Sequence, residues 1–575
     1  MRRTLAIALL SAASLAVSVQ VAPAVDMLKV VPRPLSYWKG QKLTAQPGGW
    51  QAFLAQQPAR PADHPVPTRN RVRGTSGGIW QAVTSGPANV YFCNPELLHD
   101  GTVVAQDCDA PDWWRLTPDI NGDYADGTWS EIATMPVIND VQYSPLYHAS
   151  AVLPDGRLIV EGGEYNGSQN NGNGVWTNLG AIYDPVANTW TPVNPPNSPA
   201  DNPTAWSAIG DAQSIVLPNG VFMLAACCAY PDANALFDPG TLTWRSAFAP
   251  NAGSNYQDEQ GYTLMQNGNV LTLDIWTNYF IGGNANNAEQ YRFGGSGWGA
   301  AGSTPVSLVD PIACGNFEIG PAVTRGDGSV VAFGGNTGCV AGQEADPTAI
   351  YSLTTGTWSK GPNIPHSCRL EGVSYPCDLA DAPAALLPDG NILFAASPGY
   401  GGNPTHFFEF TPANTINQVS DTLYFAHQAG AYWYNFLVLP SGQVLETDFS
   451  GTPEVYTPAG APVAAWAPTI IDSPGSVEPG STYDIIGTQL NGVSQGAAYG
   501  DDYQSATNYP IVRITNNATG HVFYAVTGHI KTMSIAPGTK SLVKFTVPSG
   551  IEAGPSQIVV VANGNPSAPA RILVE

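Results

Sequence analysis

One short pattern recurs seven times along this chain: an apolar run, a tight turn that ends in glycine, and a second apolar run. The repeats follow one another about every 50 to 60 residues, a period typical of repeat architectures. Asp-Gly and Asn-Gly between apolar runs favour β-hairpins, because these residues tolerate positive φ. A chain with this period builds many copies of one β unit. The seven turns are His99-Asp100-Gly101, Pro154-Asp155-Gly156, Pro218-Asn219-Gly220, Gln266-Asn267-Gly268, Gly326-Asp327-Gly328, Pro388-Asp389-Gly390 and Pro440-Ser441-Gly442.

Two further strands often follow each hairpin. The third ends in an aromatic residue, as at Tyr183, and the fourth opens with tryptophan, as at Trp190 and Trp358. Four strands in a unit of about 50 residues, repeated seven times, predict an all-β fold: a seven-bladed β-propeller of the kelch type. A large array of β-sandwiches is the alternative that the same strand content allows.

The ends of the repeat region predict how the ring closes. The seventh repeat has three strands, the last near Tyr456, and lacks a fourth strand led by tryptophan. An orphan strand led by tryptophan, residues 78–83, precedes the first repeat. We expect it to complete the seventh blade, because an open ring would leave unpaired strand edges.

The flanking segments predict four parts. Residues 1–24 have two arginines, an apolar run and a small-residue site ending at Ala24, the pattern of a secretory signal peptide. Residues 25–77 are expected to form an extended arm, and residues 78–466 the propeller. Residues 467–575 alternate apolar and polar positions and predict a compact immunoglobulin-like (early-set) β-sandwich.

Composition and cysteine usage limit the classes of partner and the location. The net charge is −23, which argues against nucleic acid, since phosphate binding needs clustered Lys and Arg. No later stretch is apolar enough to span a membrane, so we expect a secreted or periplasmic monomer. Eight cysteines in an exported chain favour disulfides. Cys368 with Cys377 and Cys314 with Cys339 are candidate pairs, the vicinal Cys227-Cys228 is unassigned, and Cys93 with Cys108 is a further possibility.

The residues that begin the innermost strands are expected to form the mouth of the central channel. Counting back from each turn glycine selects Cys93, Tyr147, Asp211, Glu259, Glu318, Asp381 and Trp433. Carboxylates held close together raise one another's pKa or bind a cation. Alternatively, these acids cap neighbouring blades by accepting backbone N–H bonds.

The chain resembles the copper-radical oxidases, the family of galactose oxidase and glyoxal oxidase, over residues 78–575. The stretches Gly487-Thr488-Gln489-Leu490-Asn491-Gly492, Gly500-Asp501-Asp502 and Thr507-Asn508-Tyr509-Pro510 are similar to that family's C-terminal domain. In the family, copper is held by two tyrosines and two histidines, and one tyrosine carries a radical and a thioether bond to cysteine. The resemblance implies that Tyr147, linked to Cys93 of the pair Phe92-Cys93, is the ligand that carries the radical. It also implies that Tyr432 is the axial tyrosine ligand. It also implies that Tyr165 is the aromatic residue that stacks on the linked tyrosine.

The histidine ligands depart from this pattern. The residue after Tyr432 should be a ligand histidine, and it is Trp433. The other ligand position, in a loop of the C-terminal domain, aligns with Gly528. Indole and glycine do not bind copper, whereas Cu(II) prefers imidazole nitrogen. His529 and His427 are the candidate replacements, and the resemblance thus implies copper at an altered site. No organic cofactor is expected, because the sequence has no nucleotide-binding glycine loop.

Three functions follow from these features. An exported oxidase would convert a primary alcohol or aldehyde, such as a sugar, and release hydrogen peroxide. A glycan-active enzyme would use Asp211, Glu259 and Asp381 as acid, base or metal ligands. A non-catalytic propeller would bind a glycan or a cell-surface partner.

Overall fold

The computed structural model describes residues 77–83, 86–108, 110–167, 177–196, 206, 208–210, 213–225, 234–247, 260–274, 287–295, 297–309, 318–335, 347–365, 367–370, 373–399, 402–423, 429–500 and 503–575. All of them belong to one compact unit, Pro34–Glu575. The expected signal peptide and nearly all of the expected arm lie outside this part. So do Asp211, Glu259, His427 and four of the cysteines, Cys227, Cys228, Cys314 and Cys339.

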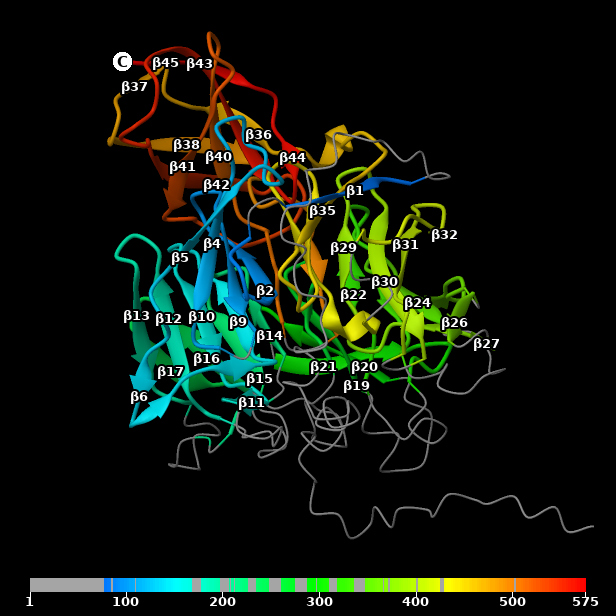
Figure 1. Cartoon of the computed structure of the whole chain (residues 1–575). Helices are drawn as coiled ribbons and strands as arrows, with labels where there is room; N and C mark the ends of the chain where they lie inside the picture. The colour runs from blue at the N-terminus through cyan, green and yellow to red at the C-terminus, as the bar shows by residue number, and fades with distance from the viewer. Residues whose placement is uncertain are drawn as a thin grey trace, which may run out of the picture. The chain divides into compact units, whose positions relative to one another are not determined.

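The described strands form seven antiparallel sheets in chain order, which we call blades 1 to 7 (Figure 1). The prediction of a seven-bladed β-propeller is confirmed. Blade 1 consists of β2 (Phe92–Leu97), β3 (Val103–Asp107), β4 (Trp113–Thr117) and β5 (Thr128–Glu131), and blade 2 of β9 (Ala149–Val152), β10 (Leu158–Glu161), β12 (Gly180–Asp184) and β13 (Thr189–Val193). Blade 3 consists of β14 (Ser214–Val216), β15 (Phe222–Ala225), β16 (Asn234–Asp238) and β17 (Thr243–Ser246), blade 4 of β18 (Thr263–Leu264), β19 (Val270–Asp274), β20 (Asn287–Arg292) and β21 (Gly297–Ser303), and blade 5 of β22 (Ala322–Thr324), β23 (Val330–Phe333), β24 (Thr348–Ser352) and β25 (Thr357–Lys360). Blade 6 consists of β29 (Ala384–Leu386), β30 (Ile392–Pro398), β31 (His406–Phe410) and β32 (Ile416–Gln418), and blade 7 of β33 (Asn435–Val438), β34 (Val444–Thr447), β35 (Glu454–Thr457) and β1 (Ile79–Ala82).

The first strands of the blades line the centre of the ring. β2 contacts both β9 and β33, β9 contacts β14, and β29 contacts both β22 and β33. Each of the seven predicted turns joins the first and second strands of its blade, and each turn glycine has positive φ, from 76° at Gly101 to 97° at Gly390. The glycine is required there because a side chain is disfavoured at such φ.

Aromatic residues repeat from blade to blade and join neighbours. Tyr183 of the third strand in blade 2 faces Trp190 of the fourth, with ring centroids 5.1 Å apart. The Trp190 indole N–H donates to the carbonyl of Ala133, which follows the last strand of blade 1 (2.7 Å). Trp244 and Trp358 make the same kind of bond to preceding blades, so this repeat both packs a blade and attaches it to its neighbour.

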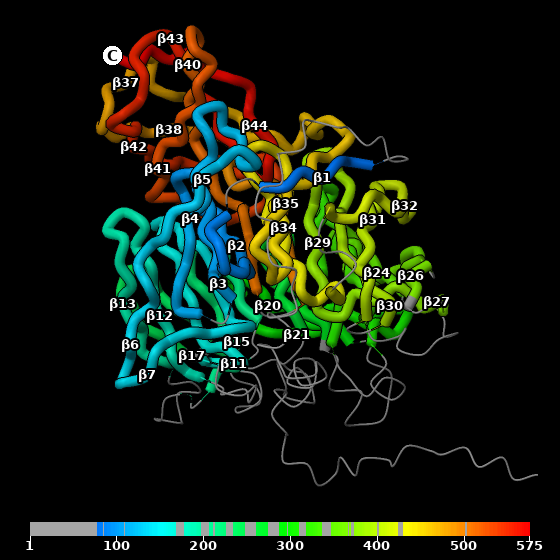
Figure 2. The backbone as a smooth tube through the Cα atoms, in the orientation of Figure 1, coloured from blue at the N-terminus to red at the C-terminus, as the bar shows by residue number. Residues whose placement is uncertain are grey.

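The ring closes as the sequence predicts. β1 pairs antiparallel with β35, and Trp80 lies opposite Tyr456 in the register. Figures 1 and 2 show β1, in blue, beside the yellow β35. The Trp80 indole donates to the carbonyl of Ser420 in the preceding blade (2.7 Å). The strand from before the first repeat therefore has the contacts of a fourth strand in any other blade.

A separate nine-stranded sheet follows the propeller. Its hydrogen-bonded order is β36 (Thr469–Asp472), β38 (Thr482–Thr488), β42 (Lys540–Thr546), β41 (Val522–Gly528), β40 (Ile511–Asn516), β43 (Gly554–Ala562), β45 (Ala570–Val574) and β37 (Ser476–Val477), with β44 (Asn565–Pro566) paired to β43. Apolar side chains such as Val512, Val543 and Phe545 are fully buried in it. The boundary near residue 467 and the immunoglobulin-like sandwich topology stay predictions.

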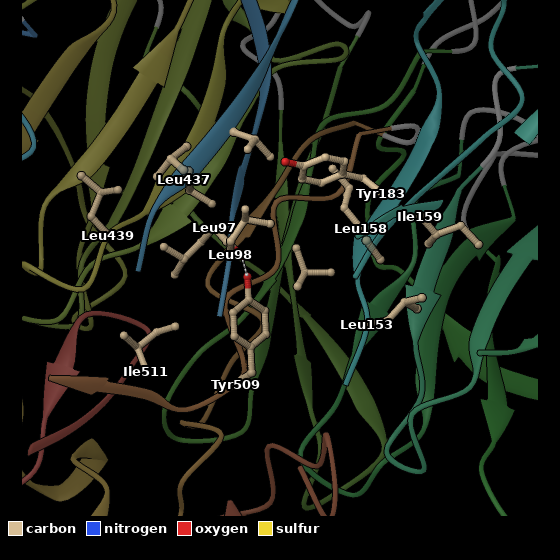
Figure 3. Close-up of a cluster of buried hydrophobic side chains, with 14 of the residues drawn as sticks. Leu97, Leu98, Leu153, Leu158, Ile159, Tyr183, Leu437, Leu439, Tyr509 and Ile511 are labelled. Carbon is tan, nitrogen blue, oxygen red and sulfur yellow. Dashed lines mark hydrogen bonds between the residues drawn. The ribbon is translucent and has the colours of Figure 1, made fainter. Parts of the chain in front are cut away.

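The segment between β38 and β40 enters the propeller. We call residues 493–500 and 503–509 the channel segment. Its short strand β39 (Ala497–Ala498) pairs with β29, the first strand of blade 6. The side chain of Gln495 accepts the N–H of Leu264 in blade 4 (2.7 Å), and the Tyr509 hydroxyl donates to the carbonyl of Leu97 in blade 1, as Figure 3 shows. The channel segment is therefore held by the first strands of several blades.

One of the expected disulfides is present. Cys368 in β26 (Cys368–Leu370) is bonded to Cys377 in β28 (Cys377–Asp378), across the loop before blade 6. Cys93 and Cys108 are both buried, in β2 and directly after β3, and a disulfide between them stays a prediction. Within the residues described, no helix is long and apolar enough to cross a membrane.

Candidate functional site

Five of the residues selected from the sequence lie in one buried group. Cys93, Tyr147, Tyr165, Tyr432 and Trp433 belong to the same cluster of contacting buried side chains, at most 3% exposed. Phe449 of blade 7 joins them, together with two residues of the channel segment, Tyr499 and Tyr503. We call these eight residues the tyrosine cluster. The structure thus brings together residues from blades 1, 2 and 7 and from the C-terminal part of the chain.

Tyr147 is at the centre of the cluster and has an unusual backbone. It precedes β9 and has a φ of 51°, a left-handed conformation that is rare for a bulky residue. Its ring lies 5.8 Å from that of Tyr503, 6.0 Å from Tyr165 and 6.2 Å from Phe449. Such strain persists only where surrounding contacts maintain it, and it is concentrated at functional sites.

Tyr165 approaches Tyr147 because a short ribbon connects their segments. β11 (Tyr165–Asn166) pairs with β8 (Pro145–Leu146), so Tyr165 lies opposite Leu146. The two tyrosine rings meet at 64°, an edge contact in place of the stacking that the resemblance implies. Edge-to-face contact is an equally favourable aromatic geometry.

Cys93 lies at the junction between blades 1 and 2. Its Sγ is 3.9 Å from Oε1 of Gln106, whose Nε2 donates to the carbonyl of Pro145 (2.7 Å). The next residue, Asn94, lies with its Nδ2 2.8 Å from Nε2 of His148. The pairs Cys93-Asn94 and Tyr147-His148 therefore lie side by side across the two blades. A thioether between Cys93 and Tyr147 stays a proposal.

His148 has the character of a buried neutral histidine. Burial lowers its pKa to about 3, although a hydrogen bond to the Pro145 backbone acts in the opposite direction. Its ring meets that of Tyr503 edge-on at 5.1 Å. Its Nε2 is 2.8 Å from the Asn94 amide nitrogen, so this ring nitrogen is already engaged in a hydrogen bond.

Tyr432 and Trp433 occupy a single 3₁₀ turn, η2 (Ala431–Trp433), before β33. Trp433 contacts the ring of Tyr432 at 5.3 Å and that of Phe449 at 5.0 Å. Its indole therefore fills the position where the resemblance requires a ligand histidine, and aromatic neighbours hold it there.

The channel segment supplies two tyrosines that sequence reasoning assigned to the sandwich. The Tyr147 N–H donates to the hydroxyl of Tyr503 (2.9 Å), and the Tyr499 hydroxyl donates to the carbonyl of Tyr432 (2.7 Å). The one signal in the sequence is a run of Gly, Ala, Ser and Tyr that interrupts the apolar alternation of strands.

His529 lies away from this group. It is an exposed residue that follows β41, with φ of 49°. Nearby Thr527 N donates to the carbonyl of His99, and Met533 N to that of Pro218. Both acceptors belong to hairpin turns, which lie at the end of the first strand of a blade. Tyr147 lies at the opposite end, just before the first strand of blade 2 begins. The structure does not bring His529 to Tyr147 and Tyr432.

Two of the predicted carboxylates are described, and both are fully buried. Asp381 precedes β29 with φ of 51°, and its N–H donates to the carbonyl of Ile319 (3.1 Å), the neighbour of Glu318. A Cβ added at Gly500 would lie 2.8 Å from Oδ1 of Asp381, so the channel segment passes directly beside this carboxylate. Whether Asp211 and Glu259 join them is outside the described residues.

Copper fits this donor set poorly. Tyr147 and Tyr432 offer two phenol oxygens. Trp433 has an indole and does not supply the imidazole nitrogen that Cu(II) prefers. Within the described residues, no three His, Cys, Asp or Glu side chains form a group that could hold a metal ion. We therefore derive no step through copper.

Comparison with known proteins gives structural likeness only. No family model matches the chain, and no curated protein matches it. Among solved structures, a fungal alcohol oxidase of the AA5 family in complex with copper covers 87% of this chain and 99% of its own, with 13% identity and a TM-score of 0.46. The extracellular domain of a hybrid two-component system from B. thetaiotaomicron covers 87% and 60% (10% identity, TM-score 0.41), and the WD40 propeller domain of Doa1 covers 67% and 97% (8%, 0.38).

Proposed function

We propose that this protein binds a carbohydrate or a small alcohol or aldehyde at the mouth of its central channel, without copper chemistry. The observation that carries the proposal is a pair of strained residues. Tyr147 and Asp381 occupy the same position in blades 2 and 6, both buried and both left-handed. Two strained residues at one end of the ring point to a functional site there.

The chemistry of the tyrosine cluster supports binding over metal-dependent oxidation. Trp433 presents an indole where a copper ligand would be needed, and its ring is packed against those of Tyr432 and Phe449. Aromatic side chains and buried carboxylates are, in contrast, the groups that sugar-binding sites commonly use: rings stack on apolar sugar faces, and carboxylates accept hydroxyl hydrogens.

A second candidate is the oxidase that the resemblance implies, which would release hydrogen peroxide from an alcohol or aldehyde. One specific observation favours it: Cys93, Tyr147 and Tyr432 are buried in a single cluster. Burial protects a tyrosyl radical from solvent, so this arrangement suits redox chemistry if a further group completes the site.

One experiment separates the two functions. Protein comprising residues 25–575 is loaded with copper, desalted, and tested by calorimetry against a panel of sugars and by peroxide assay on alcohols and aldehydes. We expect the protein to bind sugar with an affinity that a chelator leaves unchanged. We expect Tyr147→Phe to bind sugar as well. Retention of about one copper per chain, with peroxide release that Tyr147→Phe abolishes, would establish the oxidase in its place. No binding to any sugar, alcohol or aldehyde would refute the proposal.

We also propose that the protein is exported. The pattern of residues 1–24 supports this, and the Cys368–Cys377 disulfide is compatible with an oxidising compartment. Sequencing the N-terminus of protein recovered from the culture medium or periplasm tests it, and a mature start at Val25 is expected.

A further inference from the structure

We propose that Tyr503 is a positioning residue: its hydroxyl holds Tyr147 in the left-handed conformation that places this ring in the tyrosine cluster. The inference deepens the proposed function and rests on it, because the position of Tyr147 matters for ligand binding. Its first test measures hydrogen exchange and needs no ligand. Tyr147 and Tyr503 are 356 residues apart in the chain, so the C-terminal part takes a direct role in shaping a propeller residue.

Both backbone polar groups of Tyr147 have partners outside their own strand. The N–H donates to Tyr503 Oη (2.9 Å), and the carbonyl accepts the N–H of Glu164 (3.0 Å). A left-handed residue cannot continue the ladder of β9, and a buried N–H without an acceptor is costly. The hydroxyl of Tyr503 supplies an acceptor for the Tyr147 N–H.

Blade 6 offers a contrast within the same molecule. Asp381 has the same φ of 51°, but its N–H donates to the backbone carbonyl of Ile319 in the neighbouring blade. The propeller thus supports the bend at Asp381 with its own backbone. At Tyr147 it relies on a side chain that the channel segment delivers.

Tyr503 is itself well anchored. Its ring contacts those of Tyr147, His148 and Tyr499, and Ser505, two residues later, donates to the carbonyl of Pro95 in blade 1 (3.1 Å). The acceptor therefore also has contacts that do not involve Tyr147, with His148 and Tyr499, as expected of a residue that positions another.

The test is amide hydrogen exchange at Tyr147, measured by mass spectrometry with single-residue fragmentation. Tyr503→Phe removes only the acceptor oxygen, and we expect about tenfold faster exchange at Tyr147, the scale of one lost buried hydrogen bond. Tyr509→Phe is the matched control, because it removes another buried hydroxyl of the channel segment that bonds to blade 1. The control should leave the Tyr147 exchange rate unchanged.

Ligand affinity gives the second readout. Tyr503→Phe should weaken sugar binding by a similar factor, with a loss of thermal stability no larger than that of Tyr509→Phe. Unchanged exchange at Tyr147 in Tyr503→Phe overturns the inference. Faster exchange in a protein that binds no sugar upholds the positioning role and refutes the proposed function, so the two failures are distinct.

Discussion

The ring of Trp80, in the first described strand, packs 4.9 Å from that of Tyr456, in the last strand of the repeats. The two residues face each other across the β1–β35 ladder and repeat the pairing of Tyr183 with Trp190 in blade 2. Blade 7 is therefore built from both ends of the propeller segment, and its fourth strand is held by side-chain packing and hydrogen bonds, not by chain connection.

We predict that Trp80→Ala opens the closed ring at β1. Loss of a buried tryptophan costs about 3–5 kcal/mol, and here the Ser420 bond is lost too. Denaturation in urea measures the free energy of unfolding, and limited proteolysis shows whether β1 has become accessible to cleavage. Trp190→Ala is the control, since it removes the equivalent residue from a blade whose strands are contiguous. Equal resistance of β1 to protease in wild type and Trp80→Ala would contradict the prediction.

Replacing Cys368 and Cys377 together by alanine should lower the free energy of unfolding by about 2–3 kcal/mol, because the disulfide closes a short loop. Equilibrium denaturation with and without a reducing agent measures this. The reductant should destabilise the wild type by a similar amount and leave the double variant unaffected. A reductant effect of equal size in the variant would assign the loss to other cysteines.

Three buried acids in blade 7 predict a pH-dependent stability. Glu446 lies opposite Glu454 in the ladder between β34 and β35, and Asp448 follows β34. Burial raises the pKa of Asp448 to about 6, and burial together with Asp448 and Glu454 raises the pKa of Glu446 well above its usual value. A raised pKa in the folded state means that the stabilisation is complete below about pH 4 and is lost as pH rises through about 6.

Asp448→Asn should therefore be more stable than the wild type at pH 8 and no more stable at pH 4, as measured by thermal unfolding. Asn keeps the oxygen that accepts the Ser450 N–H (3.0 Å). Asp327→Asn should show the opposite pH dependence. Burial acts to raise the Asp327 pKa, but hydrogen bonds from Ser329 and the nearby Arg325 lower it overall. The charged Asp327 therefore stabilises the protein at pH 8, and this stabilisation is lost in acid. A uniform shift of Asp448→Asn at both pH values would contradict this account.

The blade hairpins were predictable because their signals are local. A glycine such as Gly156, at φ of 90°, is needed wherever two strands of one blade reverse, and the apolar runs beside it define the strands. The closing strand was predictable for a related reason: Trp80 carries the same sequence signature as the fourth strand of other blades, and blade 7 lacked one. Cys93, Tyr147 and Trp433 were selected by their register relative to the turns, which is also local, whereas Tyr432 was selected by the family resemblance.

The course of the channel segment was decided only by tertiary structure. Residues 493–500 and 503–509 carry no repeat and little strand alternation, and several of their partners lie hundreds of residues away, as Tyr147 does from Tyr503. Their position is defined by contacts with distant blades, such as the pairing of β39 with β29 and the bond from Leu264 N–H to Gln495. His529 illustrates the same limit: the sequence placed it one position from a ligand, whereas the fold places it beside the hairpin turns. Local backbone chemistry determined the blades, and long-range packing determined what fills them.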